Sequence, residues 1–94
     1  MLQLTNPEIR INPARILYIM DDTITLEGGY EVSIEPEDIA RFSNLVKLVE
    51  DFEEEGESAS YWINPDHISF IECNSVLMSN GTELKVKSID PLIK

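Results

Sequence analysis

The sequence is poor in the residues from which catalytic and metal sites are most often built. Its 94 residues include one histidine, His67, and one cysteine, Cys73. Neither a histidine pair nor a cysteine cluster is therefore available for zinc. No internal disulfide can form, which favours a reducing cytoplasm. Gly28-Gly29 lacks the lysine of a phosphate loop, and no serine carries a nucleophile signature. We expect a non-enzymatic chain without catalytic residues, cofactor or metal, and with His67 at the surface.

Basic residues and long apolar runs are also scarce. Lysine and arginine number 7 against 18 aspartates and glutamates, which gives a formal net charge of −11. Nucleic acids and anionic membranes select basic surfaces, so they should repel a chain of this charge. No apolar stretch approaches the roughly 18 residues of a membrane span, and the first residues lack the pattern of a signal peptide. The composition predicts a small soluble protein that binds neither nucleic acid nor membrane.

The sequence does carry an internal repeat, which emerges when the chain is aligned with itself at an offset of 52 residues. Ile11-Asn12-Pro13 matches Ile63-Asn64-Pro65 without a gap. The other pairs are identical or similar in kind: Ile16 with Ile68, Tyr18 with Phe70, Ile19 with Ile71, Asp22 with Asn74, Ile24 with Val76, Leu26 with Met78, Gly29 with Gly81, Glu31 with Glu83, Val32 with Leu84 and Ile34 with Val86. We interpret the pattern as a tandem duplication, with a first unit in residues 1–55, a linker in 56–60 and a second unit in 61–94 that shares its core.

Each unit is predicted to be an antiparallel β-meander of about four strands. In the first unit the strand-forming segments are residues 8–12, 15–20, 23–26 and 30–34, and the second unit repeats them 52 residues later. Gly28-Gly29 and Asn80-Gly81 supply the positive φ angles of tight hairpins. The predicted fold class is α+β, mainly β.

One amphipathic helix, residues 36–54, is predicted to join the two units. Pro36 suits a first helical turn. Apolar residues then recur at helical spacing: Ile39, Phe42, Leu45, Val46, Leu48, Val49 and Phe52. We expect this apolar face to cover an open side of the β-structure.

Several positions of the first unit follow a family pattern. They are Met1, Leu4, Thr5, Asn12, Ile16, Ile19, Thr23, Ile24, Leu26, Gly29, Tyr30 and Val32, followed by the predicted helix. This unit resembles the small FlbD-type proteins associated with bacterial flagella and swarming, relatives of which also occur in phages and mobile elements. The Ile-rich meander also looks like the LytTR domain, a DNA-binding β fold of bacterial regulators. The resemblances imply a flagellar role, a viral accessory role or DNA binding.

Comparison of the two units singles out candidate interface residues. Strand alternation places Trp62 on the outward face of its strand, where the first unit has Arg10. An outward tryptophan is either covered by the helix or the other half, or it anchors a partner. Both alternatives remain open. By the same parity Leu17 and Leu77 are weaker interface candidates.

An acidic block in residues 50–57 is the other candidate surface. Its proposed contact residues are Glu50, Asp51, Glu53, Glu54 and Glu55. Such a block is either a solvated segment or a docking surface for a basic partner. The outward face of the last strand is acidic in the first unit but carries Lys85 and Lys87 in the second. Opposite charge on related faces favours pairing between copies, so we expect a homodimer.

These observations favour a non-enzymatic protein–protein interaction module. The alternative is a phage-type inhibitor or sponge, which imitates a nucleic acid in the basic groove of a host protein or sequesters a signalling molecule. A LytTR-like DNA-binding regulator is the third hypothesis, and the negative charge opposes it.

Overall fold

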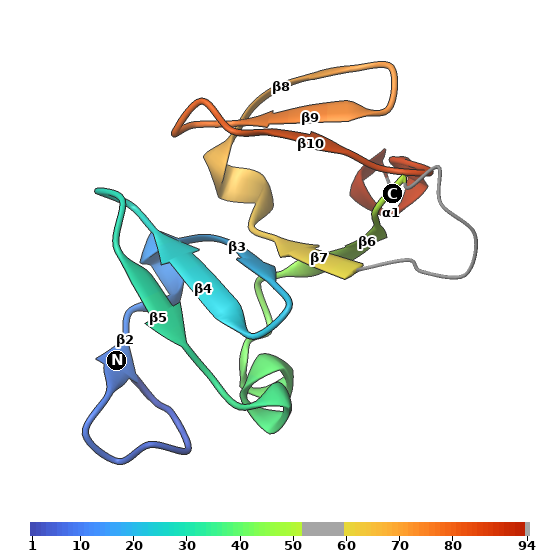
Figure 1. Ribbon diagram of the computed structural model, residues 1–94. Coiled ribbons are helices and arrows are strands. Elements are labelled where there is room, and N and C mark those ends of the chain that lie inside the picture. Colours follow the sequence, from blue (N-terminus) through green and yellow to red (C-terminus); the bar gives the residue numbers. More distant parts are fainter. Residues whose placement is uncertain (52–59, 94) are drawn as a thin grey trace.

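The computed structural model describes residues 1–51 and 60–93, and the described chain is mainly antiparallel β-structure (Figure 1). The strands are β1 (Leu2–Gln3), β2 (Arg10–Ile11), β3 (Ile16–Met20), β4 (Thr23–Leu26), β5 (Glu31–Ser33), β6 (Val46–Val49), β7 (Ser60–Ile63), β8 (Ile68–Glu72), β9 (Ser75–Met78) and β10 (Glu83–Lys85). The helical elements are the 3-10 turns η1 (Pro13–Arg15), η2 (Pro36–Arg41) and η3 (Pro65–His67) and the short helix α1 (Asp90–Ile93). The predicted mainly β class is confirmed.

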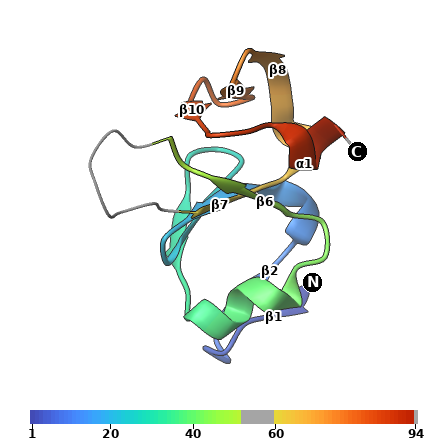
Figure 2. The same ribbon diagram turned by 90° about the vertical axis from the view of Figure 1, so that its right-hand side faces the viewer.

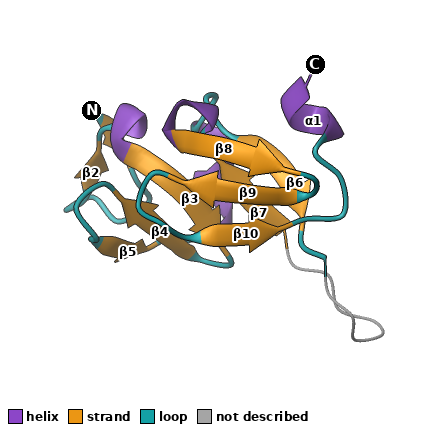
Figure 3. Ribbon diagram, turned by 90° about the horizontal axis from the view of Figure 1, so that it is seen from above, coloured by secondary structure: helices purple, strands orange, loops and turns teal. Residues whose placement is uncertain are grey.

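The strands form three antiparallel sheets in the described part of the chain. A five-stranded sheet has the order β5-β4-β3-β7-β6, a three-stranded sheet has the order β10-β9-β8, and β1 pairs with β2. Figure 3 shows the three-stranded sheet lying over the five-stranded one. Figure 2 shows η2 beside β1, at the end of the molecule opposite to β8 and α1.

The same order of local structures occurs twice, and from β2 and β7 onward the two copies are 52 residues apart. A hairpin, a 3-10 turn and a three-stranded meander form the N-terminal repeat (β1–β2, η1, β3–β5) and again the C-terminal repeat (β6–β7, η3, β8–β10). Asn12 and Asn64 cap the two turns alike, each accepting the backbone N–H two residues later at 3.1 Å. Asp21 and Cys73 have φ angles of 56° and 54° at equivalent turns.

The predicted hairpins are confirmed. Gly29 between β4 and β5 has a φ of 87°, and Gly81 between β9 and β10 has a φ of 90°. Residues with a Cβ seldom adopt this region, so glycine at both positions sets the turn. Each turn joins paired strands, with Ile24 opposite Val32 and Val76 opposite Leu84.

The predicted amphipathic helix over residues 36–54 is wrong in the part that the structure describes. Only the 3-10 turn η2 is helical, β6 occupies the middle of the range, and residues 52–54 lie outside the described residues. β6 pairs with β7, which buries Leu48 and leaves Lys47 exposed. The apolar spacing suits this alternation as well as a helix, and tertiary pairing decides between them. The C-terminal repeat therefore begins with β6, inside the range that the sequence assigned to the first unit.

Two further boundaries differ from the prediction. The strand expected at residues 8–12 is confined to β2, because Asn12 already caps η1. The linker expected at residues 56–60 lies outside the described residues except for Ser60, the first residue of β7.

The buried apolar side chains form two clusters rather than one. The N-terminal core contains Leu4, Ile11, Ile16, Ile19, Ile24, Ile34 and Phe42. The C-terminal core contains Leu17, Tyr18, Leu48, Tyr61, Ile63, Val76, Met78, Leu84 and Val86. The two clusters lie on opposite faces of the five-stranded sheet, and each takes most of its side chains from one repeat.

The pairing of β3 with β7 joins the two repeats, and side chains cross the junction in both directions. Trp62 lies opposite Ile19 and packs against the N-terminal core, although it belongs to the C-terminal repeat. In the other direction, Tyr18 lies opposite Ile63 and joins the C-terminal core together with Leu17. The junction between the repeats is therefore a strand pair with an apolar residue from each side buried in the other repeat.

Candidate interaction surface

The strand β8 has one unpaired edge in the described part of the chain. Its counterpart β3 pairs with β4 on one side and β7 on the other, whereas β8 pairs with β9 alone. In Figure 1, β8 is the uppermost strand, away from the five-stranded sheet. An unpaired edge presents a row of backbone N–H and C=O groups, which can pair with a further strand.

Two apolar side chains beside this edge are exposed although their counterparts are buried. Phe70 is 54% exposed and Ile71 is 37% exposed. The equivalent residues of the N-terminal repeat, Tyr18 and Ile19, are 8% and 0% exposed. The 52-residue offset aligns both pairs as equivalent apolar positions. They differ because β7 and the C-terminal repeat cover β3, while no described element does the same for β8.

A shallow groove of about 310 Å³ runs over the outer face of the three-stranded sheet. Its lining residues are Phe70, Glu72, Cys73, Ser75, Leu77, Glu83 and Lys85. Phe70, Leu77 and Glu83 stand in one row across the three strands, and Glu72, Ser75 and Lys85 stand in the next. The groove therefore combines the apolar side chains of Phe70 and Leu77 with charged side chains of both signs. The predicted candidate Leu77 lies in this groove.

The N-terminal repeat has a groove of about 300 Å³ at the equivalent place. Its lining includes Tyr18, Thr25 and Glu31, which are the counterparts of Phe70, Leu77 and Glu83. In this repeat Tyr18 is buried at the junction with β7, and Thr25 is polar. The apolar and accessible version of the groove is thus confined to the C-terminal repeat.

The other apolar candidates lie at the junction between the repeats. Leu17 is fully buried in the C-terminal core because the three-stranded sheet covers this face of β3, so it is not a surface residue. Trp62 points away from its own repeat, as the alternation predicted, but it is half-buried against the N-terminal core. The Lys47 ammonium nitrogen lies 5.7 Å from the centre of its ring. Trp62 was expected either to be covered within the chain or to anchor a partner, and the structure shows it covered by the N-terminal repeat.

The acidic block is described only at its beginning. The Tyr61 hydroxyl donates a hydrogen bond to Glu50 Oε1 at 2.7 Å. Burial and, after it, this carboxylate raise the pKa of Tyr61 above its usual value. Asp51 is exposed, and its backbone N–H donates to Lys85 O at 3.0 Å. Glu53, Glu54 and Glu55 lie outside the described residues.

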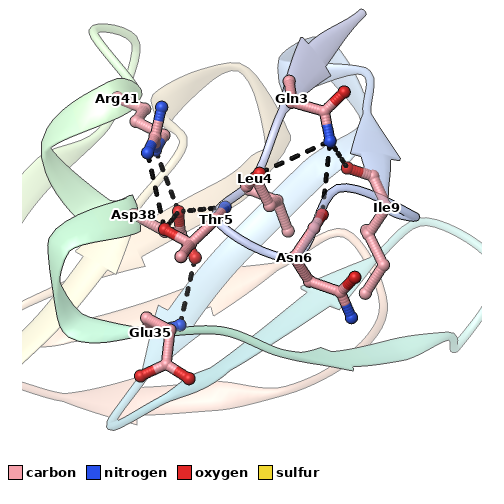
Figure 4. A network of polar contacts seen from close by, with 8 residues as sticks. All are labelled: Gln3, Leu4, Thr5, Asn6, Ile9, Glu35, Asp38 and Arg41. Atoms are coloured by element: carbon pink, nitrogen blue, oxygen red, sulfur yellow. Dashed lines mark hydrogen bonds and ion pairs between the residues drawn. The ribbon is translucent and has the colours of Figure 1, made fainter.

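A buried carboxylate that the sequence did not single out organises the end of β1 (Figure 4). Asp38 accepts hydrogen bonds from Thr5 N–H at 2.9 Å, from Thr5 Oγ1 at 2.8 Å, from Glu35 N–H at 3.1 Å and from Arg41 Nε at 2.9 Å. Burial acts to raise the pKa of Asp38, but these hydrogen bonds together hold it below its usual value. Asp38 is therefore a structural anion that ties η2 to β1. The signal in the sequence was its position three residues after Glu35, at the start of a turn that begins with proline.

Polar contacts also hold the 3-10 turns η1 and η3 against each other. Glu27 pairs with Arg15 at 2.6 Å and with His67 Nδ1 at 3.3 Å. His67 Nε2 lies 2.7 Å from Ala14 O. The Arg15 guanidinium, through its hydrogen bond, lowers the pKa of Glu27. The expectation of a surface histidine is thus corrected: the His67 side chain is 13% exposed and lies between the repeats.

The described residues contain no group of three or more histidine, cysteine, aspartate or glutamate side chains placed to hold a metal ion. Within residues 1–51 and 60–93, no helix has the length and apolar character to cross a membrane. Comparison with family models, curated proteins and solved structures gave no match for this chain. The FlbD-like and LytTR-like resemblances therefore stay predictions.

Proposed function

We propose that this chain is a non-enzymatic protein-interaction module, which binds an extended segment of a partner along the edge of β8 and the groove beside it. The observation that carries the proposal is the exposure of Phe70 and Ile71 at positions whose counterparts are buried by a paired strand. Addition of a strand to an exposed edge is a common mode of peptide recognition, in which backbone hydrogen bonds give affinity and alternate side chains give specificity.

The partner's chemistry follows from the strand that fills the equivalent edge. β7 places Ile63 opposite Tyr18 and Trp62 opposite Ile19. A partner strand on β8 should likewise present an apolar side chain to Phe70. For a partner other than this chain, the net charge of −11 favours a segment with basic flanks, because complementary charge speeds association and discriminates among partners.

A peptide with the sequence of residues 60–65, which includes β7, tests the proposal. Titrated against the isotope-labelled chain, it is expected to shift the backbone amide signals of β8 and of the groove. The variant Phe70→Glu should lose this binding, because a carboxylate replaces the apolar contact. Tyr30→Glu is the matched control, since Tyr30 is an exposed aromatic residue in the other repeat.

A second peptide carries proline in place of Trp62. Its backbone lacks the N–H that pairs with the strand edge, so it should bind much more weakly than the parent peptide. The proposal fails if the two peptides give equal shifts, or if the shifts avoid β8 and the groove.

A further inference from the structure

We propose that the partner strand belongs to a second copy of this chain: β2 of one copy pairs with β8 of another, as β7 pairs with β3 within the chain. The inference rests on the proposed function, because it names the strand that fills the β8 edge. It treats the junction inside the chain as the template for a junction between chains.

The donor strand is identified by its place in the repeat. β2 and β7 are equivalent, with Arg10 and Ile11 standing 52 residues before Trp62 and Ile63. Both strands form a hairpin in the same register, since Leu2 pairs with Ile11 and β6 pairs with β7 through Val46 and Ile63. β7 has neighbours on both edges, whereas β2 pairs only with β1 among the described residues.

The free edge of β2 is equivalent to the edge of β7 that pairs with β3. Ile9 O accepts a hydrogen bond from Leu4 N–H at 3.2 Å, so the backbone groups of Ile9 and Ile11 face β1. Because these groups alternate along a strand, the N–H and C=O of Arg10 and the N–H of Asn12 face the other way. These positions correspond to Trp62 and Asn64, whose backbone groups face β3.

Asn64 shows how the template junction is completed. Its backbone N–H donates to Leu17 O at 2.9 Å, and its side-chain Nδ2 donates to Ile16 O at 2.9 Å. Asn64 is buried, whereas its counterpart Asn12 is exposed. Pairing of β2 with β8 gives Asn12 the matching acceptors in the partner copy, the carbonyls of Ser69 and Ile68.

The same register decides which side chains meet. Arg10 of one copy lies opposite Ile71 of the other, and Ile11 lies opposite Phe70, as Trp62 and Ile63 lie opposite Ile19 and Tyr18. The exposed Phe70 is thereby covered beside the N-terminal core of the partner copy. Donor and acceptor are different surfaces, so each copy carries one of each.

Two variants block the two sides of this junction separately. Arg10→Pro removes the N–H on the free edge of β2 but leaves the bonds to β1 in place. Phe70→Glu blocks the β8 side at an exposed position. In sedimentation velocity over a wide concentration range, the parent chain and the Tyr30→Glu control are expected to associate. Each blocked variant should show a dissociation constant raised by at least about tenfold.

Mixing the two blocked variants gives the decisive measurement. The Phe70→Glu copy retains an intact β2, and the Arg10→Pro copy retains an intact β8. With one variant fluorescently labelled, the mixture is expected to form a one-to-one complex that does not grow further. Pairing of two β8 edges predicts the opposite, because Arg10→Pro alone would then associate and the mixture would gain nothing.

Arg10→Glu provides a second block of the donor that keeps the strand backbone unchanged. Association of both Arg10 variants at parent strength, or a mixture that stays monomeric, overturns the inference. A parent chain that remains monomeric throughout also overturns it. The peptide of residues 60–65 separates this failure from failure of the proposed function, since a monomeric chain that binds it through Phe70 is still an interaction module for a different protein.

Discussion

Phe70 and Tyr18 occupy equivalent positions of the two repeats, yet Phe70 is 54% exposed and Tyr18 is 8% exposed. Both are aromatic and both lie on the first strand of their three-stranded meander, β3 and β8. The difference comes from their neighbours, because β7 pairs with the second edge of β3 and no described strand pairs with the second edge of β8. The two repeats therefore use the same position for different purposes.

The unequal burial predicts unequal stability effects. Tyr18→Ala is expected to lower the free energy of unfolding by about 3 kcal/mol, because it leaves a cavity in the C-terminal core. Phe70→Ala should change it by less than about 1 kcal/mol, as at an exposed position. Urea denaturation at low protein concentration measures both. Similar losses would show that Phe70 is covered in the single folded chain.

Replacement of Asp38 should act on stability in a pH-dependent way. At neutral pH Asp38→Asn is expected to cost about 2 kcal/mol, because an amide nitrogen then faces the N–H of Glu35 or Thr5. The pKa of Asp38 is lowered on folding, so its contribution is complete above the ordinary aspartate pKa and disappears as the pH falls through the lowered value. The stability difference between parent and variant should thus shrink only in acid, below about pH 4. A difference that is constant down to strong acid contradicts this role.

Trp62 is expected to matter for folding as well as for any contact between chains. Trp62→Ala should lower the free energy of unfolding by about 3 kcal/mol, because the ring packs against the N-terminal core. Lys47→Ala should cost only about 0.5 kcal/mol, the value of an exposed cation–π contact. Arg10→Ala is the matched control, since Arg10 is the exposed counterpart of Trp62. A Trp62→Ala variant as stable as the parent would show that the Trp62 ring does not contribute to the folded core.

Salt distinguishes association between copies from binding to a basic partner. Each copy carries a net charge of −11, and salt at 0.1 M screens charges over about 10 Å. Self-association is therefore expected to tighten as sodium chloride is raised, and binding of a basic peptide is expected to weaken. Analytical ultracentrifugation and fluorescence titration over the same salt series measure the two effects. Self-association that weakens with salt would indicate that charge attraction drives it.

Local chemistry made part of the fold predictable from the sequence. Gly29 and Gly81 set the hairpin turns, and the alternation of isoleucine and valine set the strands around them. The helix over residues 36–54 failed because the apolar residues near Leu48 fit a helical stripe and a strand equally well. Pairing of β6 with β7 decides in favour of the strand.

The candidate surface was only partly predictable for a related reason. Alternation gave the direction of Trp62 but not the element that covers it. Phe70 and Ile71 align with Tyr18 and Ile19, which are buried in the first repeat, and nothing in the sequence distinguishes the two pairs. The available signal was the number of Ile-Asn-Pro motifs, because each of the two motifs begins at the end of a hairpin strand and precedes a meander. One pairing inside the chain, β7 with β3, therefore leaves one hairpin strand, β2, and one meander edge, β8, without such a partner among the described residues.

Cys73 closes the turn between β8 and β9, is exposed and borders the groove. As the only thiol of the chain, it accepts a maleimide dye or a spin label without any other residue being changed. A probe at this place borders the same groove as Phe70. Its emission or its relaxation then reports occupancy of the groove in real time, while the rest of the molecule stays silent.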